Sequence, residues 1–248
     1  MKRMYDFFAK YYDSLMSDVD YKKRAEYLLG LFCRFGKKPA LLLDLACGTG
    51  NISAEFAKSG ISVIGVDASE EMLSVAQNKA IEQGLDILYL CQKAEELDLY
   101  GTVDGAVCCL DSLNHITDYN DFRKTILKVS LFLEKGSIFI FDMNTVYKHE
   151  HILADNSFVY EKENIYCVWQ NSYRKEKSTT QITLDFFEKQ KNEYQRFTET
   201  FSERAYTESE ILSALKKANL KVEAVYGDMT ETPAKKDEQR QIYVTRKV

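Results

Sequence analysis

Short apolar runs alternate with amphipathic stretches along the first 150 residues. The apolar runs have the length of strands and occupy residues 40–45, 62–67, 86–91, 104–110 and 137–143. The stretches with helical periodicity occupy residues 51–58, 69–83 and 119–134, and Gly60, Gly84 and Gly136 lie at or just after their ends. Because strands that are apolar on both faces and alternate with helices need cover on both sides, the pattern predicts a doubly wound, mostly parallel α/β sheet.

The pattern changes near residue 150. Residues 150–206 are rich in Tyr, Phe, Thr and Val with charged residues interleaved, and this alternation predicts three or four antiparallel strands exposed on one face. We therefore expect an inserted β-rich subdomain at residues 150–206, within a main domain formed by residues 1–149 and 207–248.

The last segment should complete the main domain. Thr207 and Glu210 have the spacing of a capping box, which predicts that a helix begins there. Two closing apolar runs, 221–227 and 240–248, are predicted to form a terminal antiparallel hairpin.

Composition narrows the classes of partner. The 248 residues are 45% hydrophobic and 29% charged, which suits one large domain with an appendage. The net charge of -5 and the short basic runs argue against nucleic acid and anionic membranes. The N-terminal residues lack the apolar core of a signal peptide, and the apolar stretches are too short to span a membrane. The six cysteines form no CxxC pair, and we expect a cytoplasmic protein. Because the charge disfavours nucleic acid and membranes, we expect it to act on a small molecule, as a monomer or homodimer.

The stretch LLLDLACGTGN, residues 41–51, predicts a ligand-binding turn. Asp44 lies near the carboxyl end of a strand, and Gly48 and Gly50 precede a helix, at the sheet edge where open α/β folds bind ligands. A P-loop would need GxxxxGK[ST], which is absent, and Ser53 occupies the third glycine position of the dinucleotide fingerprint. A nucleoside bound without phosphate fits better, because Asp44 would repel a diphosphate but attract an ammonium group.

A second acid supports this interpretation. Asp67 ends the next strand, 23 residues after Asp44, at about the spacing of the acid that binds ribose hydroxyls. Each acid also has an ordinary explanation, Asp44 as a helix-entry residue and Asp67 as part of the capping region of the helix that begins at Ser69. The two acids, the glycines between them and the strand before each together favour the nucleoside site.

Two stretches, LLLDLACGTGN at residues 41–51 and VIGVDASEEML at residues 63–73, together resemble motifs I and II of class I S-adenosylmethionine-dependent methyltransferases. The resemblance extends to YDFFAKYYDSLMSDVDY, CCLDSLNHI, ERAYTESEI and QRQIYV, and thus to nearly the whole chain. It is to small bacterial methyltransferases of the domain 25/11 type, whose substrates are generally unassigned. The resemblance implies a Rossmann-like sheet, S-adenosyl-L-methionine as cofactor, and an N-terminal segment that covers it.

The resemblance also implies a set of cofactor-binding residues. Asp44, Ala46, Gly48 and Gly50 would surround the methionine moiety, and Asp67 would accept both ribose hydroxyls. The adenine would be lined by Ala68, Met72 and Ala94. The N-terminal segment that covers the cofactor would contribute Tyr5 and Tyr12, and Leu110 would lie beside the ammonium group. The alternative for Met72 is that it belongs to the core of its helix. The alternative for Tyr5 and Tyr12 is that they pack in the core without touching the cofactor.

One position departs from the family pattern. Where an Asp often receives the adenine amino group, this chain has Lys93, which carries no acceptor. The backbone N–H of Ala94 remains available, and Glu95 is the candidate for the missing acceptor.

The polar residues after the fourth strand are the catalytic candidates. Among Asp111, Ser112, Asn114 and His115, a general base is expected first at His115, because imidazole titrates near neutral pH, with Asp111 as the alternative. Asn114 belongs to the same expected set. The alternative is that Asp111 or Ser112 caps the turn and His115 packs.

Three further features are weaker. His149 and His151 have a possible metal-ligand pattern, but such segments are more often exposed to solvent, and we expect no metal. Phe201 stands where related chains often carry a histidine. The charged residues around it belong either to the surface or to the substrate wall: Glu199, Glu203 and Arg204.

The sequence therefore predicts methyl transfer to a nitrogen, oxygen or carbon atom of a small molecule. The aromatic residues of the insertion would suit a cation or a ring: Tyr160, Tyr166, Trp169 and Tyr173. Two alternatives stay open, a non-catalytic protein that binds S-adenosylmethionine or S-adenosylhomocysteine and an NAD-dependent oxidoreductase. A protein or RNA methyltransferase is disfavoured by the charge and the cover.

Overall fold

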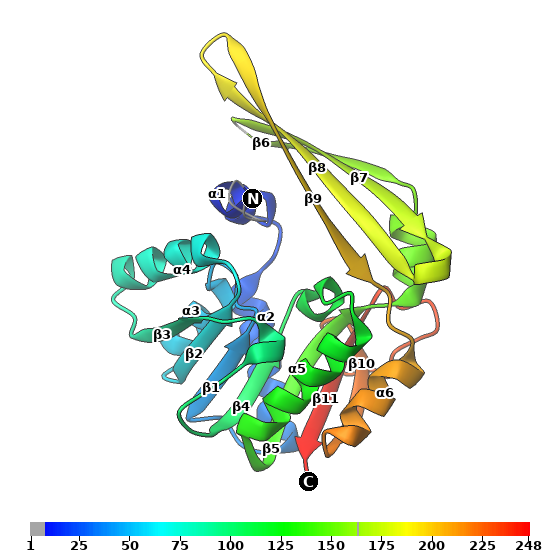
Figure 1. The fold of residues 1–248 in the computed structure, drawn as a ribbon. Coiled ribbons are helices and arrows are strands. Elements are labelled where there is room, and N and C mark those ends of the chain that lie inside the picture. The colour runs from blue at the N-terminus through cyan, green and yellow to red at the C-terminus, as the bar shows by residue number, and fades with distance from the viewer. Residues whose placement is uncertain (1–7, 163) are drawn as a thin grey trace.

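The computed structural model describes residues 8–162 and 164–248, and its main domain is built on a seven-stranded sheet (Figure 1). The strand order is β10-β11-β5-β4-β1-β2-β3. The bounds are β1 Leu41–Leu45, β2 Ser62–Asp67, β3 Ile87–Cys91, β4 Val103–Cys108, β5 Leu133–Asn144, β10 Leu220–Gly227 and β11 Arg240–Lys247. The first five strands pair in parallel, whereas β11 is antiparallel to both β5 and β10. The doubly wound sheet with a terminal antiparallel hairpin is confirmed.

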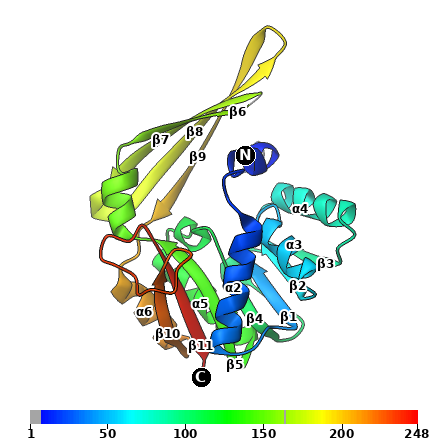
Figure 2. The ribbon, with the colours of Figure 1, turned by 180° about the vertical axis from the view of Figure 1, so that it is seen from behind.

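Helices cover both faces of this sheet. On one face, α5 (Tyr119–Phe132) and α6 (Glu208–Lys217) pack over an apolar core that includes Phe122, Val129 and Leu215. On the other face, α2 (Tyr21–Phe35) and α3 (Asn51–Lys58) enclose a second core with Phe32 and Phe56 (Figure 2). Helix α4 (Glu70–Glu82) follows β2, and the capping box of Thr207 and Glu210 begins α6 as predicted.

Two local features differ from the sequence analysis. Helix α2 was not among the predicted elements, although Ala25, Leu28 and Phe32 form its buried face. Helix α5 ends at Phe132 and β5 begins at once, so Gly136, with φ of +85°, lies inside a strand instead of at a helix end. The register between β4 and β5 shifts in this region, and this irregularity accommodates the left-handed glycine.

The insertion forms a separate four-stranded antiparallel sheet, here called the inserted sheet. Its strands are β6 Ser157–Lys162, β7 Ile165–Arg174, β8 Thr179–Gln190 and β9 Glu193–Arg204, in the order β6-β7-β8-β9. The chain enters through the π-helix η3 (Lys148–Leu153), and the short 3-10 turns of the molecule are η1 Ala94–Glu96, η2 Ser112–His115 and η4 Lys175–Lys177. One face of the inserted sheet carries a small apolar core with Ile182, Leu184 and Phe186.

The inserted sheet extends over one end of the main domain, and α1 (Phe8–Leu15) lies between it and α4 (Figures 1 and 2). Its apolar face turns toward the main domain, because Tyr11 and Leu15 of α1 pack against its core. Among residues 8–162 and 164–248, no helix has both the length and the apolar character to cross a membrane.

Candidate functional site

A pocket opens at the carboxyl end of β1, beneath α1. Residues from α1, the start of α2, the glycine turn, α3 and the loop after β4 line it: Tyr12, Tyr21, Asp44, Ala46, Cys47, Gly48, Thr49, Asn51, Ile52, Cys109, Leu110 and Ser112. The structure thus brings together five predicted cofactor residues, which are Tyr12, Asp44, Ala46, Gly48 and Leu110. Tyr5 lies outside the residues that the structure describes.

The two glycines of the turn have different environments. Both have left-handed φ angles, +54° at Gly48 and +73° at Gly50. A Cβ on Gly48 would meet no atom within 4 Å, whereas a Cβ on Gly50 would overlap the hydroxyl of Tyr89 and lie 2.9 Å from the Cβ of Ala76. Gly48 therefore leaves open space beside the pocket, and Gly50 allows the turn to pack against β3 and α4.

Asp67 is held at the end of β2 by backbone amides. The N–H of Gly48 donates to its Oδ2 at 2.8 Å and the N–H of Ser69 to its Oδ1 at 2.9 Å. Burial raises the pKa of Asp67 in spite of these bonds. A carboxylate offers about four lone pairs, more than these backbone donors use, so Asp67 can still accept a hydroxyl donor. Ala68 beside it is exposed, and Met72 in α4 is buried.

Asp44 is the more deeply buried of the two acids. It is 2% exposed and accepts a hydrogen bond from the hydroxyl of Ser53, the residue at the third fingerprint position. Burial raises the pKa of Asp44 to about 7, and the nearby charge of Asp67 acts in the same direction. A cation brought into the pocket would favour the ionised form of Asp44.

The adenine candidates after β3 lie apart from the pocket lining. The side chain of Lys93 is exposed and lies 3.8 Å from Glu96 in an ion pair. The turn η1, which contains Ala94 and Glu95, packs against α5, and Glu95 interacts electrostatically with Lys124 there. The structure does not bring Glu95 to the pocket lining.

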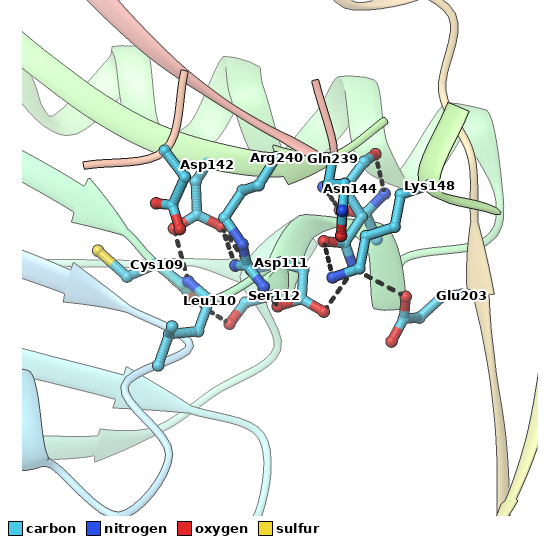
Figure 3. A network of polar contacts seen from close by, with 12 residues as sticks. Cys109, Leu110, Asp111, Ser112, Asp142, Asn144, Lys148, Glu203, Gln239 and Arg240 are labelled. Atoms are coloured by element: carbon cyan, nitrogen blue, oxygen red, sulfur yellow. Dashed lines mark hydrogen bonds and ion pairs between the residues drawn. The ribbon is translucent and has the colours of Figure 1, made fainter. Parts of the chain in front are cut away.

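A buried charge network supports the loop after β4 (Figure 3). Asp142 at the end of β5 accepts the N–H groups of Leu110 at 2.7 Å and Asp111 at 2.6 Å, and these two residues have φ angles of +58° and +54°. Arg240 donates to Asp142 and to Asp111, at 2.7 Å each. Arg24 of α2 adds a second guanidinium, 3.7 Å from Asp142. Sequence reasoning did not assign Asp142, Arg240 or Arg24; the only signal for Arg240 was its place in the QRQIYV motif.

Asp111 is the charged partner in this network. Burial opposes its ionisation, but the positive charges of Arg240 and Lys148 outweigh it and hold the pKa of Asp111 well below its usual range. Asn144 donates a further hydrogen bond to Asp111 at 2.7 Å. Asp111 therefore stays ionised and is a weak base near neutral pH.

His115 lies at the boundary between the main domain and the inserted sheet. Its side chain is 32% exposed, its ring stacks on Phe201 at 5.2 Å, and its Nε2 lies 3.7 Å from a carboxylate oxygen of Glu203. Glu203 comes from β9 and is 3% exposed; burial and the charge of Asp111 raise its pKa. The inserted sheet thus places a carboxyl group beside the imidazole of the main domain.

Asn114 has a structural environment. It is fully buried, its Nδ2 donates to the carbonyls of Asn144 and Arg204, and its Oδ1 accepts the N–H of Asn144. These bonds engage both ends of its amide, so the structure places Asn114 in the interior and away from the pocket.

The histidine pair after β5 is not uniformly exposed, which corrects the sequence expectation. His151 is exposed, but His149 is fully buried on η3, where its Nδ1 lies 2.8 Å from the hydroxyl of Thr180. Burial lowers the pKa of His149 to about 4, so this side chain is neutral near physiological pH. The reason is tertiary, because β8 of the inserted sheet covers η3.

One group of side chains has metal-ligand character that the sequence did not reveal. Donor atoms of Asp111, His115 and Glu203 all lie within 4.8 Å of one another. The guanidinium of Arg240 is 2.7 Å from Asp111, and Lys148 also interacts with this carboxylate. These cations supply positive charge beside the three donor groups.

Comparison with known proteins shows the family of the chain. Residues 42–136 match the family model described as methyltransferase domain. A protein of Bacillus subtilis (strain 168) named "Putative methyltransferase YqeM" is 32% identical over 245 residues, which cover 98% of this chain and 97% of the relative. The chain belongs to the methyltransferase family.

Solved structures of methyltransferases agree in fold. An S-adenosylmethionine-dependent methyltransferase from Clostridium acetobutylicum ATCC 824 superposes with a TM-score of 0.87 at 34% identity, over 98% of both chains. CalS10 from Micromonospora echinaspora, an amino pentose methyltransferase solved with S-adenosylmethionine bound, has a TM-score of 0.75 at 18% identity, over 93% of this chain and 92% of its own. This methyltransferase is of class I, and its cofactor is S-adenosyl-L-methionine.

Proposed function

We propose that this methyltransferase acts on a small molecule bound between the cofactor pocket and the inserted sheet, and that His115 removes the proton of the acceptor. The observation that carries the proposal is the position of His115, partly exposed at the end of η2 with Glu203 of the inserted sheet 3.7 Å away. Of the three predicted catalytic residues, Asp111 is held ionised by Arg240 and Asn114 is buried. This leaves His115 as the base.

The pocket residues fit the cofactor. Bound S-adenosyl-L-methionine supplies an electrophilic methyl group on a sulfonium. We assign the ammonium group to Asp44, which lines the pocket. We assign the ribose hydroxyls to Asp67, which lies outside the lining but accepts the N–H of the lining residue Gly48. The open space at Gly48 and the half-buried Tyr12 would shape the methionine side of the pocket.

The residues of the chain have two tasks in the reaction. They hold the acceptor atom in line with the methyl carbon, which is the larger part of catalysis for a good leaving group. The lone pair of the acceptor atom forms the new bond to the methyl carbon, and the electron pair of the broken carbon–sulfur bond stays on sulfur. His115 takes the proton that the acceptor loses. Glu203 would stabilise the imidazolium that results.

The aromatic side chains of the inserted sheet favour an acceptor with apolar or cationic character. Tyr160 and Trp169 pack on the same face of this sheet as Phe201, whereas Tyr166 lies exposed on the opposite face. The fold neighbours named as an amino pentose methyltransferase and a sugar N-methyltransferase make small amines a sensible first group of acceptors. The negative charge of the chain disfavours nucleic acid.

The test combines calorimetry with a turnover assay. Purified protein is titrated with S-adenosylmethionine, S-adenosylhomocysteine and NADH, and release of S-adenosylhomocysteine is then followed across a panel of amines, phenols and acidic carbon compounds. We expect His115→Ala to lower turnover by at least about 100-fold without weakening cofactor binding. His151→Ala, which changes an exposed histidine, is the matched control and should retain activity.

Three outcomes would contradict the proposal. Full turnover in His115→Ala would remove this residue from the chemistry. Tight binding of both sulfur nucleosides with no turnover on any acceptor would favour the non-catalytic binding protein. Binding of NADH alone would return the site to the oxidoreductase interpretation.

A further inference from the structure

Helix α1 contacts both parts of the molecule at once. On one side Tyr11 and Leu15 pack against the apolar core of the inserted sheet, and the hydroxyl of Tyr11 donates to Glu188. On the other side the next residues face the main domain, where Tyr12 lines the pocket. Figures 1 and 2 show α1 in this intermediate position.

Asp13 makes three hydrogen bonds from α1 to the main domain. It accepts hydrogen bonds from Thr49 Oγ1 at 2.6 Å, Asn51 Nδ2 at 2.8 Å and Lys79 Nζ at 2.8 Å. These donors belong to the glycine turn, the first residue of α3 and the last turn of α4. One carboxylate therefore joins α1 to three elements of the main domain, and two of its three partners, Thr49 and Asn51, line the cofactor pocket.

The charge on Asp13 is stabilised in this position. Burial alone would raise its pKa, but the hydrogen bonds from Lys79, Thr49 and Asn51 outweigh burial and lower it. Charge-assisted hydrogen bonds are stronger than neutral ones, and three of them end on the same side chain. An isolated helix of eight residues is not stable in water, so the position of α1 depends on such tertiary contacts.

We propose that Asp13 is a latch that holds α1 over the pocket and thereby sets the rate at which the cofactor leaves. Movement of α1 away from the pocket has to withdraw Tyr12, and it breaks all three bonds of Asp13 in the same step. Asp13 is thus a positioning residue that acts through Tyr12 and α1. The inference rests on the pocket that the proposed function assigns to the cofactor, and it is independent of the acceptor and of His115.

The experiment measures the dissociation rate of S-adenosylhomocysteine by stopped-flow chase with excess S-adenosylmethionine. Trp169, the one tryptophan of the chain, packs with α1 on the same apolar core and serves as the fluorescent reporter. We expect Asp13→Ala to speed dissociation about tenfold, because bonds to a charged group are lost, with a smaller change in association rate. Asp18→Ala is the matched control, because its side chain is 88% exposed and lies 3.9 Å from its ion-pair partner Lys162.

A double-mutant cycle separates a latch from a general loss of structure. The Asp13→Ala, Lys79→Ala double variant should dissociate no faster than Asp13→Ala alone, because both changes remove the same bond. Should Asp13→Ala fail to fold, Asp13→Asn keeps an acceptor for Thr49 and Asn51 while losing the charge that faces Lys79. It should give an intermediate rate at an unchanged melting temperature.

The outcomes distinguish this inference from the proposed function. A dissociation rate of Asp13→Ala within twofold of wild type, or fully additive effects in the cycle, would overturn the latch. Wild-type protein that binds neither sulfur nucleoside would overturn the latch together with the proposed function. Binding without turnover on any acceptor would leave the latch standing and remove only the catalytic part of the proposal.

Discussion

Asp44 and Asp67 are carboxylates at the ends of neighbouring strands, and their surroundings give them different properties. Asp67 accepts two backbone N–H groups, whereas Asp44 accepts the hydroxyl of Ser53 in a fully buried position. Burial raises the pKa of Asp44 from 3.8 to about 7. Between these two values the folded protein holds a proton that the unfolded chain has lost. The stability contributed by Asp44 is therefore present at low pH and is lost as the pH rises through about 7.

Cofactor binding should reverse the preference of buried Asp44 for its protonated form. An ammonium group placed beside Asp44 favours the carboxylate, so binding at pH 6 has to expel a proton that is already gone at pH 8. We expect the affinity for S-adenosylhomocysteine to rise about tenfold between these pH values, with proton release on binding. Calorimetry in two buffers of different ionisation enthalpy measures both quantities. Asp44→Asn should remove the dependence of the affinity on pH. The control Asp121→Asn, on the exposed side of α5, should keep it. The same pH dependence in wild type and both variants would contradict the role of Asp44.

At the scale of elements, the terminal hairpin completes the site from the far end of the chain. Arg240 is the first residue of β11, and it reaches Asp111 although 129 positions separate the two in sequence. Its side chain is 14% exposed and lies between Asp111 and Asp142, the second of which is 3% exposed. The antiparallel pairing of β11 with β5 places Arg240 opposite Asn144, at the end of the strand that carries Asp142.

Removal of Arg240 should therefore be costly. Arg240→Ala leaves two carboxylates in a buried site with one partner fewer, and we expect it to lower the free energy of unfolding by about 3 kcal/mol. Arg246→Ala on the same strand is the control, because Arg246 is more exposed and pairs with Glu223 near the surface, and its cost should stay within about 1 kcal/mol. Urea titrations at pH 7 measure both. A cost for Arg240→Ala no larger than that of the control would show that the buried charges do not depend on this guanidinium.

At the scale of the whole molecule, sequence periodicity located most elements but not their contacts. The strand runs, the glycine turn at residues 46–50 and the capping box at Thr207 are local signals, and they agree with the structure. The bonds of Asp13 to Lys79 and of Arg240 to Asp111 span 66 and 129 positions, and no spacing rule connects such residues. His149 shows the same limit, because its burial depends on a strand of the inserted sheet.

The junction between the two sheets also depends on a long-range contact. The chain leaves the main sheet after Asn144, the last residue of β5, and returns through Arg204, the last residue of β9. The amide of Asn114 bonds to both points, with its Nδ2 2.8 Å from the carbonyl of Arg204 and 3.1 Å from that of Asn144. One buried side chain therefore joins the outgoing and the returning strand, which explains why an apparently catalytic position is closed to the pocket.

Asn114→Ala tests whether this amide fixes the orientation of the inserted sheet. The change leaves two carbonyls and one N–H without their partner in a buried region, and we expect a loss of about 2 kcal/mol in the free energy of unfolding. The diagnostic result is local: amide exchange should accelerate at the ends of β5 and β9, where the bonds are lost, and remain slow in β1 and β4. Asn120→Ala on the first turn of α5 supplies the control for a polar truncation outside the junction. Uniform acceleration across both sheets would assign Asn114 to global stability and would leave the orientation of the inserted sheet to α1 and its contacts.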